Sequence, residues 1–372
     1  MNKLQKILEG KFFITLLSIL ISFVVGAFFL LILGISPVAA YTKLFTSIFG
    51  SVKSMSYCVV YGLPLIFTGL SVAFSFRTGV FNIGAEGQFV VGSMAACVVG
   101  ILLGDLPAAV LVPLCFLAAM AAGAVWGLIV AFLKVKWGIN EVLSMIMFNW
   151  IAFYLSNYIA DTEAIHNEGN AEATRNVSEN AMILFPKSWL KATCPSANWG
   201  IVLAIVAVII MYIIIEKTTL GYTLKAVGFN RNAAEYGGIN VSRSIYMAMA
   251  ISGILAGIGG AVQLLGMGGR ISIFTSQESY GFQGISVALI GASNPIGVFF
   301  AGIFYGALKY GGSKLNLIGA PSEVVSIIMG TVVFFIAISH VFKFRKRKKA
   351  EKAAKPAAIE TTETAEEKGG DK

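Results

Sequence analysis

Long apolar runs separated by short polar segments dominate this chain of 372 residues. Most runs have about 17 to 25 residues, which is the length that an α-helix needs to cross a bilayer. About ten runs can be placed, the eighth and ninth of them short: residues 12–34, 58–76, 89–103, 108–133, 142–159, 200–215, 245–265, 280–292, 298–310 and 324–342. The pattern predicts an all-α polytopic membrane protein with about ten transmembrane helices.

Composition supports this interpretation. Hydrophobic residues make up 57% of the chain and charged residues only 13%, whereas soluble domains carry about 25% charge. A water-soluble globule is therefore excluded. The first run, 12–34, is longer than the roughly 7 to 15 apolar residues of a signal peptide, so we interpret it as an uncleaved first span that begins on the inner face.

The net charge of +9 reports orientation. Threading ten spans from an inner N-terminus places 16 lysines and arginines on inner segments before the tail, and eight on outer segments, with Lys309 counted among the outer ones. This bias agrees with the positive-inside rule and predicts that both termini are cytoplasmic. The basic residues flank apolar runs, so we expect membrane lipid around the chain and no nucleic acid partner.

Two polar segments and a tail divide the chain. We expect a transmembrane domain over residues 1–342, with an external loop at 161–198 and a cytoplasmic segment at 216–243. Residues 343–372 are first basic and then rich in Ala, Glu, Lys and Thr, which predicts a disordered cytoplasmic tail. The four cysteines and two histidines show no metal-ligand spacing, so neither a disulfide nor a metal site is expected.

The segment 77–88 breaks the apolar pattern most strongly. Its three glycines, with Asn82, Glu86 and Gln88, join two apolar runs almost without a loop. Non-helical backbone at membrane depth is tolerated only beside protein or water, which predicts a broken or re-entrant element near 77–88 along a polar path. A carboxylate there is costly unless it is paired or hydrated. Glu86 is therefore either the partner of Arg77 or a residue of the translocation pathway, with equal weight.

A similar segment lies one half-chain later. Residues 277–286 again surround a glutamine, Gln283, with glycines, and an acid precedes it. Two matched elements, one from each half, are typical of transporters with internal repeats. Asn149, inside the fifth run, is a buried amide that is best explained by an interhelical hydrogen bond and remains a candidate pathway residue.

The inner segment 216–243 predicts a short capped helix. Asn230 can cap residues 231–236, and Gly237 or Gly238 can end that helix. With the small Ala233 and Ala234, such a helix suits docking to a partner, and an amphipathic connector is an equally good explanation.

Three motifs in order resemble the permeases of bacterial ABC importers for branched-chain amino acids, simple sugars and nucleosides. They are residues 81–89 (FNIGAEGQF), 228–239 (GFNRNAAEYGGI) and 281–291 (GFQGISVALIG). The Glu86 form is most similar to the nucleoside branch. The resemblance implies a bundle like that of type II ABC importers in a bacterial cell membrane. It also implies ATPase coupling through the second motif, at Gly228, Asn230, Ala233, Ala234 and Gly238.

The resemblance implies a permease subunit that forms the path for a nucleoside or simple sugar. The chain has no G-x-x-x-x-G-K-[ST] motif, so it is expected to bind no cofactor itself, and ATP belongs to a partner ATPase. The other implied partners are a second permease, identical or different, and an external substrate-binding lipoprotein. Alternatives are the same role for branched-chain amino acids, or an ion-coupled transporter using Glu86 and Arg77. An intramembrane enzyme is disfavoured, because the sequence shows no set of nucleophile, base and orienting residue and no metal-ligand spacing.

Overall fold

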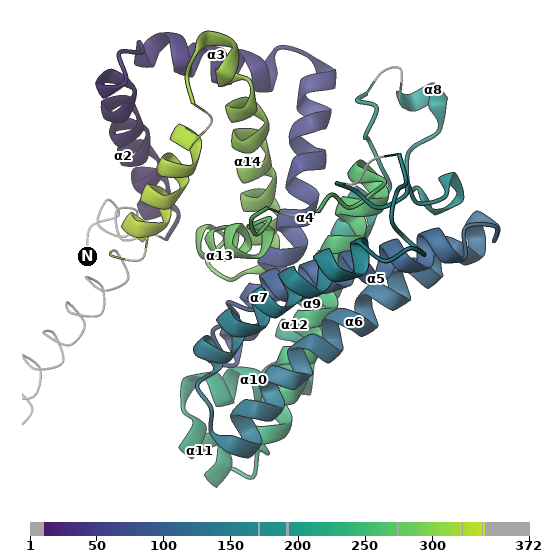
Figure 1. Ribbon diagram of the computed structural model, residues 1–372. Coiled ribbons are helices and arrows are strands. Elements are labelled where there is room, and N and C mark those ends of the chain that lie inside the picture. The colour runs from purple at the N-terminus through teal and green to yellow at the C-terminus, as the bar shows by residue number, and fades with distance from the viewer. Residues whose placement is uncertain are drawn as a thin grey trace, which may run out of the picture.

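The computed structural model is built from α-helices and describes residues 11–169, 172–190, 193–273, 275–321, 323–336 and 338. The helices are α2 (Lys11–Ile32), α3 (Pro37–Phe49), α4 (Val52–Arg77), α5 (Ala85–Leu102), α6 (Ala108–Trp137), α7 (Glu141–Ala160), α8 (Lys187–Leu190), α9 (Gly200–Lys217), α10 (Thr219–Phe229), α11 (Arg231–Tyr236), α12 (Val241–Gln263), α13 (Tyr280–Ile290), α14 (Pro295–Ser313) and a final helix, Glu323–Ile336 (Figure 1). The described residues therefore confirm an all-α architecture.

The ten predicted runs all fall on helices. Within the described part of the chain, six helices are long and apolar enough to cross a membrane: α4, α5, α6, α7, α9, and α12 with the π-helical turn Leu264–Gly268 that follows it. The polytopic membrane class is confirmed. The last run, 324–342, is described only in part. The predicted tail at 343–372 lies outside the described residues.

Helix α3 was not predicted. Its residues include Tyr41, Thr42 and Lys43, so the segment lacks a long apolar run. The helix begins because Ser36 accepts a hydrogen bond from the Ala39 N–H and proline stands in the first turn, both of which favour a helix start. Its buried face, which includes Leu44 and Ile48, packs on α14.

The predicted break near 77–88 is present. Helix α4 ends at Arg77 and α5 begins at Ala85, so residues 78–84 connect two helices without helical structure. Gly79 has φ +68°, a conformation that favours glycine. A Cβ there would lie 3.3 Å from the Gly228 Cα, which shows how closely this connection approaches the end of α10.

Helix α12 packs against α4, α5 and α6. A Cβ on Gly253 of α12 would collide with the Gly123 carbonyl of α6, and one on Gly306 of α14 would collide with Gly62 of α4. Close approach through small residues is how membrane helices gain packing energy without a hydrophobic drive. The first crossing lies among the helices at the lower right of Figure 1 and the second among those at the top, and the packing of α12 on α4 joins the two groups.

The two polar segments lie at opposite ends of the bundle (Figure 1). The segment 161–198 folds over one end, where Val177 and Ala181 are buried and the Ser178 hydroxyl donates to the Gly104 carbonyl at 2.8 Å. Helices α10 and α11 lie at the other end. All four cysteines, including Cys194 of this segment, are unpaired and buried.

Candidate functional site

Glu86 binds the start of α13. Its Oε1 accepts a hydrogen bond from the Ser279 N–H at 2.6 Å, and its Oε2 accepts one from the Gly281 N–H at 2.7 Å. Ser279 has a left-handed backbone and gives α13 no side-chain cap. The carboxylate from α5 therefore accepts from N–H groups that would otherwise be unpaired, and its negative charge is favourable at the positive end of the helix dipole. Glu86 is only 1% exposed and joins the two similar segments that the sequence singled out.

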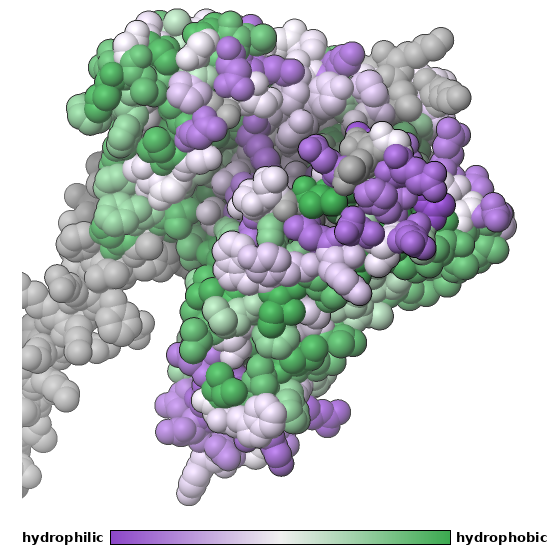
Figure 2. All heavy atoms as spheres, in the orientation of Figure 1, coloured by the Kyte–Doolittle hydropathy of each residue, from purple (hydrophilic) through white to green (hydrophobic). Residues whose placement is uncertain are grey.

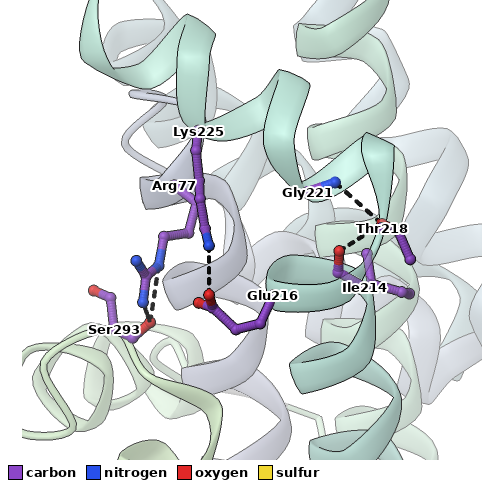
Figure 3. Close-up of polar contacts among 7 residues, drawn as sticks. All are labelled: Arg77, Ile214, Glu216, Thr218, Gly221, Lys225 and Ser293. Carbon is purple, nitrogen blue, oxygen red and sulfur yellow. Dashed lines mark hydrogen bonds and ion pairs between the residues drawn. The ribbon is translucent and has the colours of Figure 1, made fainter.

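Arg77 does not pair with Glu86. Its Nε and Nη2 donate to the Ser293 carbonyl at 3.2 and 3.0 Å (Figure 3). That carbonyl lies in the turn between α13 and α14, where Ala292 and Ser293 have φ near +52° and +53°. Arg77 therefore ties the end of α4 to a backbone turn, and the hypothesis of an Arg77–Glu86 pair is wrong.

Asn82 and Gln88 belong to a buried amide and hydroxyl network. The Asn82 Nδ2 donates to Gln88 Oε1 at 3.0 Å and to the Ser252 hydroxyl at 2.5 Å. Ser252 in turn contacts Ser71 at 2.8 Å. The network connects α4, α5 and α12 around the broken segment. That Asn82 and Gln88 lie on a translocation path remains a prediction.

Asn149 holds the same segment from α7. Its Nδ2 donates to the Ile83 carbonyl at 3.0 Å, and its Oδ1 accepts from the Gly87 N–H at 2.9 Å. The amide thus satisfies two backbone groups where helix α5 begins. An interhelical hydrogen bond was the preferred sequence interpretation, and this geometry agrees with it.

Gln283 lines a polar groove. The groove has a volume of about 280 Å³ and lies between α4, α13, α14 and the helix Glu323–Ile336. The Lys309 Nζ donates to Gln283 Oε1 at 3.1 Å and stands 3.7 Å from the centre of the Tyr280 ring. Lys309 was counted with the outer loop residues, but it lies inside α14, four residues before the end of that helix. The charge count could not reveal this position of Lys309, because the count treats each lysine as a loop residue.

Helices α10 and α11 form the predicted coupling segment. The Asn230 Oδ1 accepts from the Ala233 N–H at 3.1 Å and caps α11, and Gly238 follows with φ +82°. Ala233 is exposed, but Ala234 is only 5% exposed and faces its own chain. Ala234 therefore cannot be a direct docking contact.

Two aromatic side chains are exposed here instead. Phe229 is 91% exposed and Tyr236 is 98% exposed, at the ends of α10 and α11. Aromatic side chains are enriched in the contact surfaces between proteins, so these two rings are candidate docking contacts. They lie within the second motif, so their position was available from the sequence, but their exposure required the fold.

The coupling segment touches the broken segment directly. A Cβ on Gly228 would collide with the Arg77 carbonyl, and the Arg231 Nη2 donates to the Gly79 carbonyl at 3.3 Å. Nearby, Lys225 pairs with Glu216 at 2.7 Å, and Thr218 caps α10 by accepting from the Gly221 N–H at 3.2 Å (Figure 3). A force on α11 would therefore reach the end of α4.

A polytopic bundle whose centre holds a broken, polar segment is the architecture expected of a membrane transport protein. Residues 54–337 match the family described as branched-chain amino acid transport system / permease component. The chain belongs to this family and is a multi-pass permease subunit of an ABC importer. Such a permease subunit is not itself an enzyme.

Named relatives agree with this assignment. The guanosine ABC transporter permease protein NupP of Bacillus subtilis is 36% identical over 92% of this chain and 97% of its own length. The nucleoside ABC transporter permease protein NupB of Lactococcus lactis is 33% identical over 99% of both chains. The glucose ABC transporter permease protein TsgB13 of Haloferax volcanii is 32% identical over 88% of this chain and 87% of its own.

Among solved structures, PsaBC from Streptococcus pneumoniae in complex with Fab resembles the fold, with a TM-score of 0.46 and 13% identity. The likeness covers 80% of this chain and 95% of that chain.

Proposed function

We propose that this permease carries a nucleoside across a bacterial cell membrane. Two similar relatives that match it almost end to end are named for guanosine or nucleoside transport. The glucose permease from Haloferax volcanii makes a simple sugar the second candidate. Nucleosides and sugars share neutral, hydroxyl-rich chemistry, which suits a path with amides and hydroxyls.

The energy comes from a separate ATPase subunit that docks on α10 and α11. The observation that carries this proposal is the contact of that segment with the broken connection, through Gly228 and the hydrogen bond from Arg231 to Gly79. Closure of an ATPase against the exposed Phe229 and Tyr236 would move the end of α4 relative to α13. Alternating access needs only such a change between two packings of one bundle.

The rest of the importer follows from this role. A second permease, identical or different, completes the path, and an external substrate-binding lipoprotein delivers the solute. Both termini and α11 lie on the cytoplasmic face, and the folded segment 161–198 faces outward. The site residues Asn82, Glu86, Gln88 and Asn149 shape the path by holding the broken segment, and Gln283 faces it.

An ion-coupled transporter is less well supported. That mechanism uses Glu86 and Arg77 as a coupling pair, but the Glu86 carboxylate binds two backbone N–H groups and Arg77 binds the Ser293 carbonyl. Neither group is the partner of the other.

Uptake in cells tests the proposal. Radiolabelled guanosine or inosine should enter cells that carry the complete importer and should not enter a strain lacking this chain. Excess unlabelled nucleoside should compete, whereas glucose and leucine should not. Uptake should continue when an uncoupler is added while ATP is kept high. Competition by leucine or glucose alone would assign a different solute, and collapse with the uncoupler would favour ion coupling.

A further inference from the structure

The polar groove beside α13 differs from another cavity of similar size. That cavity, between α5, α6 and α7, also has a volume of about 280 Å³ and is lined almost entirely by apolar side chains such as Met94 and Leu155. The groove has Gln283, Lys309 and Glu323 in its wall. A hydroxyl-bearing solute would lose hydrogen bonds in the apolar cavity and regain them in the groove. Figure 2 shows hydrophilic residues within a hollow of the face between α14 and the segment 161–198.

Aromatic rings supply a second feature of the groove wall. Tyr61 of α4 and Tyr305 of α14 line it, and Tyr280 lies behind Lys309. Tyr305 is largely buried yet lines the groove, so the part of it that is accessible faces the groove. Planar bases stack on such rings, a contact worth about 1–3 kcal/mol per base in single-stranded nucleic acids.

A row of tyrosines leads to the groove along α4 and α14. The rings of Tyr57 and Tyr310 stack with centroids 5.2 Å apart, and the Tyr61 ring lies 5.8 Å from that of Tyr310. Tyr57 lies near the start of α4 and Tyr310 near the end of α14, and Tyr61 lies one turn further along α4. The start of α4 and the end of α14 lie at the same end of the bundle (Figure 1). Under the topology proposed above, this is the outer end.

The charges near the groove disfavour phosphate. Lys309 already donates to Gln283 and stands over the Tyr280 ring. Glu278 and Glu86 lie within electrostatic reach of Lys309, and Glu323 lines the groove itself. Among the described residues that line the groove, Lys309 is the one cation, and three carboxyl groups lie near it. Lys314, just past the end of α14, is held over the Tyr310 ring. The groove wall therefore offers no unengaged cation to a phosphate, which Arg or Lys normally binds.

We propose that the groove formed by Tyr61, Gln283, Tyr305, Lys309 and Glu323 is a contact site for an uncharged nucleoside during translocation, and that it rejects phosphorylated nucleosides. The base lies against the tyrosine rings while Gln283 and Glu323 offer hydrogen bonds to its edge or to the ribose. The volume is close to the lower limit of about 300 Å³ for small-molecule sites. This assignment depends on the proposed function, because it names where the transported solute touches this chain.

Transport by groove variants is the first test. Gln283→Leu and Tyr305→Leu should each lower inosine uptake at least tenfold in cells with the complete importer, at unchanged membrane levels of the protein. Tyr158→Leu is the matched control, since Tyr158 is 73% exposed on α7 outside the groove; it should keep wild-type uptake. If the wild type itself takes up no nucleoside, the proposed function fails. If the wild type transports inosine and both groove variants stay within twofold of it, only the groove assignment fails.

Protection of an introduced thiol is the second test and does not depend on transport rate. All four native cysteines are buried, so they give little background with a membrane-impermeant maleimide. Ser326 lines the groove and is exposed, whereas Thr42 is exposed on α3. Millimolar inosine should slow labelling of Ser326→Cys at least threefold and leave Thr42→Cys unchanged, and inosine monophosphate should slow neither. Equal labelling with and without inosine, or equal protection by the monophosphate, would overturn the assignment.

Discussion

At the scale of single residues, Glu86 is the clearest case of a side chain whose importance the sequence shows and whose role it does not. A carboxylate in an apolar context demands a partner, which is why the sequence singles it out. The partner is the backbone of Ser279 and Gly281, about 195 positions away. Backbone N–H groups are the same in every sequence, so no residue pattern could have identified them, and Arg77 was the nearest visible alternative.

Glu86→Gln should destabilise the bundle. The amide has one acceptor oxygen, so one of the two N–H groups at the start of α13 loses its partner, at a cost of about 1–3 kcal/mol. Glu86→Ala should be worse, because both partners are lost. Thermal stability in detergent, followed by size-exclusion chromatography, should rank wild type above Gln and Gln above Ala, and nucleoside uptake should fall in the same order. Glu163→Gln, at an exposed glutamate outside α10 and α11, should match the wild type. A Glu86→Gln protein with unchanged stability would show that the cap is dispensable.

At the scale of elements, the apolar periodicity predicts the helices well and their roles only partly. All ten runs fall on helices within the residues that the structure describes, because backbone groups in an apolar environment must bond to one another. Helix α3 was missed because the search was for long apolar runs, and polar residues interrupt the apolar residues of this amphipathic helix. Helix α13 has only 11 residues, about 16 Å at 1.5 Å per residue, which is about half of the hydrocarbon thickness. Its start within the bundle is what makes the cap by Glu86 necessary.

Phe229→Ala combined with Tyr236→Ala should release the ATPase subunit. These rings are almost fully exposed at the ends of α10 and α11, so their removal takes away contact area without opening a cavity in this chain. Co-purification of the ATPase should fall at least tenfold, while insertion and thermal stability of the permease stay normal. Tyr154→Ala, an exposed tyrosine on α7, is the control. Ala234→Arg should differ by lowering stability, because Ala234 is buried. Undiminished co-purification of the double variant would remove these rings from the docking surface.

At the scale of the whole molecule, Arg77 connects parts that the sequence keeps apart. Its carbonyl meets Gly228 at the end of α10, and its guanidinium binds the Ser293 carbonyl between α13 and α14. It also lies within electrostatic reach of Glu216 in α9 (Figure 3). Arg77 thus contacts the coupling segment, the end of α4 at the broken segment, and the turn beside α13, whereas the hydrogen bond from Arg231 to Gly79 joins only the first two. Motif order in the sequence predicts that these segments cooperate, but only the packing shows that Arg77 reaches the turn between α13 and α14.

Arg77→Ala should therefore uncouple ATP hydrolysis from transport. The variant loses two hydrogen bonds from a charged donor, a change worth about 1.5–3 kcal/mol, which corresponds to roughly tenfold or more in the balance between two packings. The docking rings are untouched, so ATPase co-purification and basal hydrolysis should remain within twofold of wild type while nucleoside uptake falls about tenfold or more.

Arg77→Lys should recover little, because a lysine cannot present two donors in a fixed geometry. Arg243→Ala, at an exposed arginine of the same end, should leave both activities unchanged. If uptake and hydrolysis fell together in Arg77→Ala, the residue would support docking or folding and would not transmit motion from α11 to α13.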